Sequence, residues 1–138
     1  MDTLFTCIYI HERPKLETMF EKRELHRAIG ELAYVISKAQ SGHELDEKKA
    51  FFEIIESELK FDAWAAESRF EILDEVIHPT IDHAYNDAIH EFNKYKSHLT
   101  PELKATTIRV VEAVAKVYFK SEVQQFVIDR LKEDLKDL

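Results

Sequence analysis

The stretch that decides the fold is residues 81–95, IDHAYNDAIHEFNKY, which comes shortly after Pro79. Its apolar residues recur every three or four positions and form one stripe: Ile81, Ala84, Tyr85, Ala88, Ile89, Phe92 and Tyr95. This spacing is typical of one face of an α-helix. The stretch therefore predicts an amphipathic helix whose stripe faces a hydrophobic core.

Two further helices are predicted downstream by their start signals. Thr100-Pro101-Glu102 combines a capping hydroxyl, a proline at the first helical position and an acid near the positive end of the dipole. Ser121, with Gln124 three residues later, fits a capping box. We expect these helices to bury Leu103, Thr107, Val110, Val111, Val114 and Val117, and then Val123, Phe126, Val127, Leu131 and Leu135.

The N-terminal half shows the same period with weaker end signals. Pro14 is expected to end the apolar segment 4–10, for which helix and strand both stay open, and to start a helix that stops near Gly42. Gly30 lies inside that helix at a cost of about 1 kcal/mol relative to alanine, which indicates a closely packed neighbour. Asp46 and Asp62 are expected to cap two more helices. Their apolar positions are Phe51, Ile54, Ile55 and Leu59, and Trp64, Phe70, Leu73 and Ile77.

Composition supports a single all-α domain over residues 1–138, a compact bundle of about six to seven helices. The chain has only two glycines, which excludes a glycine-rich phosphate loop. Its net charge of −8 argues against nucleic-acid binding. Cys7 is the only cysteine, so we expect no internal disulfide and a reduced, cytoplasmic setting. No stretch reaches the length of a membrane span.

Two groups of residues are candidate metal ligands. His83, Asp87 and His90 share one side of the predicted 81–95 helix and could hold zinc or iron. That side is opposite the apolar stripe, so the simpler interpretation is a solvated face. Glu44, Asp46 and Glu47 beside Gly42 could hold a hard divalent cation. Helix capping explains two of these acids without a ligand.

The sequence contains no pattern typical of a catalytic site, and we expect no enzymatic activity. Cys7 lies in an apolar run where a thiol is inert, and no serine has the context of a nucleophile. Trp64 has two interpretations, an anchor for a protein partner or an ordinary core aromatic.

Two stretches carry a resemblance to a known family. They are residues 32–46, LAYVISKAQSGHELD, and residues 101–116, PELKATTIRVVEAVAK, the second followed by Ser121-Glu122. Each resembles the helix, link and acid-rich helix of the tellurite-resistance TerB-like family. Ser41-Gly42 replaces the Asp-Gly of the family, and the second half has no glycine. The resemblance implies two similar helical halves and a stress-associated, non-enzymatic role. The family's acidic link positions are implicated in metal binding, and their loss in this chain argues against a metal role.

Together these observations predict a non-catalytic helical module that binds a protein partner. The alternative is a metal-binding helical protein that uses one of the two ligand groups above. Self-association into a homo-oligomer stays open.

Overall fold

The computed structural model describes residues 2–39, 45–117 and 120–138, with the backbone alone for residues 2–15 and 45–47. The elements run in the order α1 (Asp2–Lys38), α2 (Leu45–Leu59), η1 (Lys60–Asp62), α3 (Ala63–Ile72), η2 (Leu73–Ile77), α4 (Ile81–Lys94), η3 (Lys96–His98), α5 (Pro101–Ala115) and α6 (Glu122–Asp137). Here η1 and η3 are 3₁₀ turns and η2 is a π-helical turn. No strand occurs within these described ranges, so the predicted all-α bundle is confirmed.

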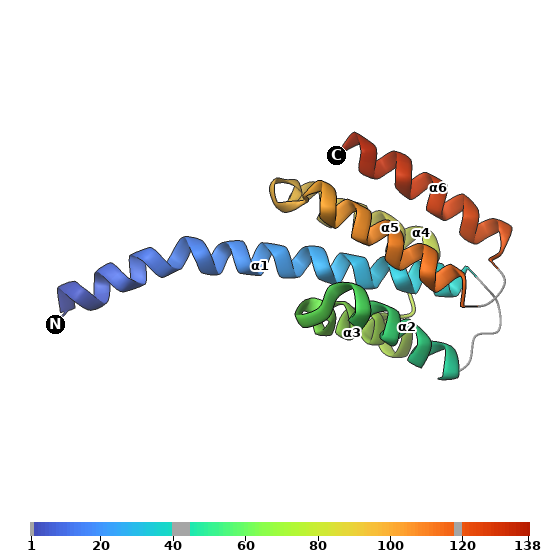
Figure 1. The fold of residues 1–138 in the computed structure, drawn as a ribbon, viewed down its shortest axis with the longest axis horizontal. Helices are drawn as coiled ribbons and strands as arrows, with labels where there is room; N and C mark the ends of the chain where they lie inside the picture. The colour runs from blue at the N-terminus through green and yellow to red at the C-terminus, as the bar shows by residue number, and fades with distance from the viewer. Residues whose placement is uncertain (1, 40–44, 118–119) are drawn as a thin grey trace.

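The C-terminal half of α1 is the centre of the bundle. It lies between α2 and α3 on one side and α4, α5 and α6 on the other, while its N-terminal part projects beyond them (Figure 1). Every residue from Ala28 to Ser37 is buried. A helix that is covered on all sides is typical of the middle of a core.

The closest approach in the core lies between α1 and α3, at Gly30. A Cβ atom placed on Gly30 would lie 2.1 Å from the carbonyl oxygen of Ala66. Only a residue without a side chain fits there, so the expected close neighbour of Gly30 is confirmed.

The predicted break at Pro14 is wrong, because α1 continues through it and the segment 4–10 is helical. The ring of proline fixes φ near the helical value, but its missing amide proton and its clash with the carbonyl four residues earlier cost about 3 kcal/mol or more in a helix interior. The helix runs through Pro14 in spite of this cost. At the other end, α1 stops at Lys38, and Gln40 to Gly42 lie outside the described residues.

Three of the helix starts are capped by hydroxyl side chains. Thr80 accepts a hydrogen bond from the His83 amide, and Thr100 accepts one from the Leu103 amide. Ser121 forms the predicted capping box with Gln124. These caps fix where α4, α5 and α6 begin.

The two predicted aspartate caps are wrong in different ways. Asp46 lies inside α2, which begins one residue earlier. Asp62 precedes α3 but its backbone is already helical and its side chain makes no cap bond. The reason is that η1 leads directly into α3, so the backbone never takes the extended conformation of a cap.

The apolar stripes are largely as predicted. In α4, Ala84, Tyr85, Ala88 and Phe92 are buried, while Ile81, Ile89 and Tyr95 pack against the core from its edge. Four predicted core residues are instead exposed: Trp64, Ile77, Val123 and Phe126. In α6 the buried face contains Val127, Leu131 and Leu135, and Phe126 lies roughly 150° around the helix from it at 100° per residue.

Candidate functional site

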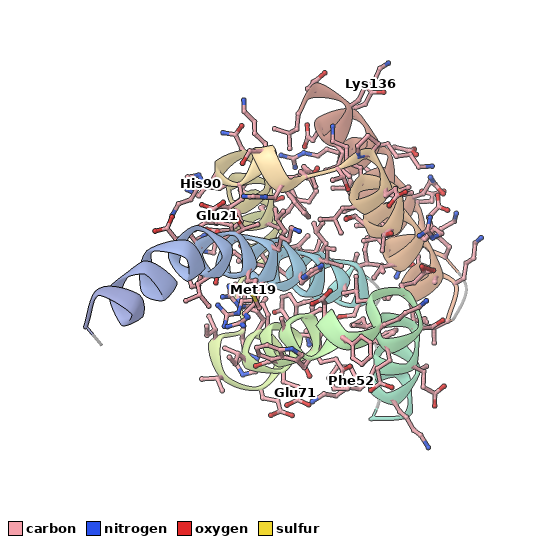
Figure 2. The ribbon with its side chains drawn as sticks, turned by 60° about the vertical axis from the view of Figure 1, so that its left-hand side comes forward. Met19, Glu21, Phe52, Glu71, His90 and Lys136 are labelled. Carbon is pink, nitrogen blue, oxygen red and sulfur yellow. The ribbon has the colours of Figure 1, made fainter. Side chains whose placement is uncertain are left out.

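The predicted metal ligands do not converge. His83 and His90 lie exposed on α4, and Figure 2 shows His90 at the surface. Glu44 lies outside the described residues, and Asp46 and Glu47 are described only as backbone within α2. In the described part of the chain, no three His, Cys, Asp or Glu side chains are placed to hold a metal ion. The metal hypothesis thus gains no support from the geometry and stays a prediction.

Asp87, the third residue of the predicted histidine face, faces a buried glutamate instead. Glu31 lies in the fully covered part of α1 and is 2% exposed. Its Oε1 atom has no hydrogen-bond partner among the described residues and lies 3.6 Å from Nη1 of Arg69 on α3. Asp87 and Glu91 of α4 act on it from the other side.

This arrangement makes Glu31 a proton-holding group. Burial, together with a hydrogen bond to Asp87 and the negative charges of Asp87 and Glu91, raises the pKa of Glu31 to about 9. The guanidinium of Arg69 acts in the opposite direction and does not outweigh them. At neutral pH, Glu31 is therefore a neutral acid, and its interaction with Asp87 favours this protonated form.

A second candidate lies at the surface, where α1 passes η1 and α3. We call it the Trp64 pocket, a hollow of about 260 Å³. Its lining residues are Met19, Lys22, Arg23, His26, Asp62, Trp64 and Ala65. Figure 2 shows Met19 on the side of α1 that faces α3.

The Trp64 pocket joins an aromatic wall to a basic rim. Trp64 is 53% exposed, and the guanidinium carbon of Arg23 lies 5.0 Å from its ring centroid. Lys22 and Arg23 form no ion pair with any side chain that the structure describes. Such an arrangement offers cations and an apolar surface side by side.

His26 and Asp62 form the remaining polar part of this rim. Nε2 of His26 lies 3.7 Å from a carboxylate oxygen of Asp62. Burial lowers the pKa of His26 despite the opposing effect of Asp62. The imidazole is therefore largely neutral at pH 7. The charged side chains that line the pocket are those of Lys22, Arg23 and Asp62.

The turn between α2 and α3 displays a second aromatic residue. Lys60 has a φ of 55°, in the left-handed region that costs a residue with a side chain roughly 1–2 kcal/mol. Phe61 follows it and is 95% exposed. Phe61 and Trp64 line a neighbouring hollow of about 580 Å³, so Trp64 forms a wall between two depressions.

The sequence alone leaves two interpretations of Trp64 open and does not predict that the residues around it form a pocket. The exposure of Trp64 excludes the core interpretation. The basic residues Lys22, Arg23 and His26 were missed, although they follow Met19 at spacings that place several of them on one side of a helix.

Comparisons with known proteins supply no relative for this chain. No family model, no curated protein and no solved structure matches it. Within the described residues, no helix combines the length and apolar character needed to cross a membrane.

Proposed function

We propose that this chain is a non-catalytic helical module that binds a protein partner through the surface formed by α1, η1 and the start of α3. The observation that carries the proposal is the exposure of Phe61 and Trp64 beside two hollows. Exposed apolar clusters with a polar rim are typical of interaction sites. Tryptophan is also enriched among the residues that contribute most to binding energy.

The TerB-like assignment, the count of about six to seven helices, the cytoplasmic location and the stress-associated role are also proposals. They rest on the stretches 32–46 and 101–116 and on the composition of the chain. A TerB-like chain should consist of two similar halves. An experimental structure in which the two halves do not superimpose would count against this part of the proposal.

A pull-down from native lysate tests the binding surface. Wild-type protein is compared with a Phe61→Ser/Trp64→Ala double variant. The control is Val76→Ser/Phe126→Ser, which removes two apolar side chains that are 71% and 67% exposed at other places. We expect a specific protein to be retained by wild type and control and lost from the Phe61/Trp64 variant.

Two results would contradict the proposed function. One is that wild type retains nothing above background. The other is that the Phe61/Trp64 variant retains the same protein as wild type, provided that circular dichroism shows all three proteins to be folded.

A further inference from the structure

We propose that the Trp64 pocket binds an acidic segment of the protein partner. In this arrangement a carboxylate of the segment pairs with Lys22 and Arg23, and a neighbouring apolar side chain packs against Met19 and Trp64. The inference rests on the proposed function for the idea that this surface binds protein, and it adds the chemical class of the ligand.

The charge distribution is the first argument. Several cations of the described chain have acidic partners: Arg27 with Glu24, Lys38 with Asp74, and Lys48 with Glu75. Lys22 and Arg23 have none among the described side chains, in a chain with a net charge of −8. Asp62 is the only acid lining the pocket. His26 is largely neutral and adds no full positive charge, but Lys22 and Arg23 alone already outnumber Asp62.

The chemistry of the two cations is the second argument. The planar guanidinium of Arg23 presents paired donors that match a carboxylate. The ammonium of Lys22 lies one residue away on α1 and lines the same pocket. A carboxylate placed between them would gain two charge-assisted hydrogen bonds.

The size and lining of the hollow are the third argument. At about 260 Å³ it is smaller than the roughly 300–1,000 Å³ of ordinary small-molecule sites. Met19 and Trp64 are both half-exposed, and they supply apolar walls that a carboxylate alone would not use. A peptide that carries an acidic and an apolar side chain next to each other uses both halves of the pocket.

The net negative charge of the chain does not prevent this binding at physiological salt. Charges farther from the pocket than about 8 Å are largely screened at about 0.15 M salt. Lys22 and Arg23 would touch the ligand directly and are screened much less. The assay should therefore be carried out at about this ionic strength.

The test uses Trp64 itself, because it is the only tryptophan in the chain. The probe is a fluorescein-labelled peptide of sequence EELFEE, titrated with the full-length protein. Anisotropy of the label reports affinity, and an unlabelled titration followed by tryptophan emission reports the place of binding. Comparison peptides are KKLFKK, which reverses the charge, and EESSEE, which removes the apolar side chains.

Two double variants separate the pocket from general charge. Lys22→Gln/Arg23→Gln removes the two pocket cations. Lys94→Gln/Lys136→Gln removes the same charge from exposed positions on α4 and α6, and Figure 2 shows Lys136 far from Met19. Thermal melts establish that both variants are folded before binding is compared.

We expect EELFEE to bind saturably and to change the emission of Trp64. The Lys22/Arg23 variant should bind at least about tenfold more weakly, whereas the Lys94/Lys136 variant should match wild type. KKLFKK and EESSEE should both bind more weakly than EELFEE.

Several results would overturn the inference. They are no saturable binding of EELFEE up to about 1 mM, equal binding of KKLFKK, and no effect of the Lys22/Arg23 variant. Equal binding of EESSEE, with displacement by inorganic phosphate, would show a simple anion site instead. If the pull-down depends on Phe61 and Trp64 but EELFEE does not bind, only the acidic class of the ligand is rejected and the proposed function stands.

Discussion

Glu31 is a buried glutamate whose pKa is raised by its surroundings. It lies in the most deeply covered turn of α1, and Oε1 has no hydrogen-bond partner among the described residues. A buried glutamate avoids the cost of a desolvated charge by keeping its proton. Asp87 and Glu91 on α4 strengthen this preference, and Arg69 on α3 weakens it. The residue therefore links the stability of the core to pH.

The first prediction is that Glu31→Gln makes the protein less sensitive to alkaline pH. The pKa of Glu31 is about 9 in the folded state, against an ordinary value of 4.5. Between these values the folded state holds a proton that the unfolded state has lost, so the contribution of Glu31 to stability falls as pH rises. Glutamine cannot ionise. We expect wild type to lose about 1–3 kcal/mol more than the variant between pH 6 and pH 8.

Urea unfolding of both proteins at several pH values measures this difference. Equal m-values are required before the free energies of unfolding are compared. Parallel pH profiles for wild type and the Gln variant would show that Glu31 does not hold its proton in this range.

The second prediction concerns Gly30, where the carbonyl of Ala66 leaves no room for a Cβ atom. Gly30→Ala would normally stabilise a helix by about 1 kcal/mol. Here we expect the reverse, a loss of about 1–3 kcal/mol or more, because α3 must move away from α1. Thermal or urea unfolding measures the change. A more stable variant would mean that the two helices do not approach as closely as the structure shows.

At the scale of elements, the sequence predicted the features that depend on residues close together in the chain. The stripe of α4 and the caps at Thr100 and Ser121 were read from residues a few positions apart. The exposure of Phe126 was not predicted, because it depends on how α6 is rotated against the bundle. The sequence of α6 alone does not determine this rotation, because it depends on packing against the other helices.

The candidate site escaped the sequence for a related reason. The Trp64 pocket joins residues of α1, η1 and α3, and only packing brings them together. Glu31 did leave a signal, since it is one of only two strongly polar residues in the run from Ala28 to Ser37, AIGELAYVIS. A helical stretch that is apolar on all sides indicates burial all round.

The third prediction compares the two sides of α4. Phe92→Ala should cost about 3–5 kcal/mol through lost burial and a cavity, because its side chain is fully buried. Ile89→Ala should cost less, about 1–2 kcal/mol, since Ile89 lies at the edge of the core.

His83→Ala and His90→Ala serve as controls on the exposed side and should stay within about ±0.5 kcal/mol. Denaturant melts of the four variants measure the order. A larger loss for either histidine variant would support the metal hypothesis, because removing an exposed side chain that holds no ligand costs little stability.

At the scale of the whole molecule, α1 has two different parts. Its C-terminal half is the axis around which α3, α4 and α5 pack, whereas its N-terminal part extends past the bundle (Figure 1). The bundle should therefore depend on one part and not on the other.

The fourth prediction follows from this division. A chain without residues 1–14 should keep the melting temperature of the full chain within about 2 °C. We expect its free energy of unfolding to change by less than about 0.5 kcal/mol. Calorimetry of the two proteins measures it at several concentrations. A fall that depends on protein concentration would show that the projecting part joins copies of the chain.

The central position of α1 also has a consequence for biosynthesis. This helix leaves the ribosome before the helices that cover it, and α5 ends only at Ala115. At about 5–20 residues per second, the apolar surface around Leu32 stays uncovered for roughly 4–16 s. During that interval the nascent chain exposes the apolar run that later becomes the middle of the fold. We expect a chaperone to bind the nascent chain at this run.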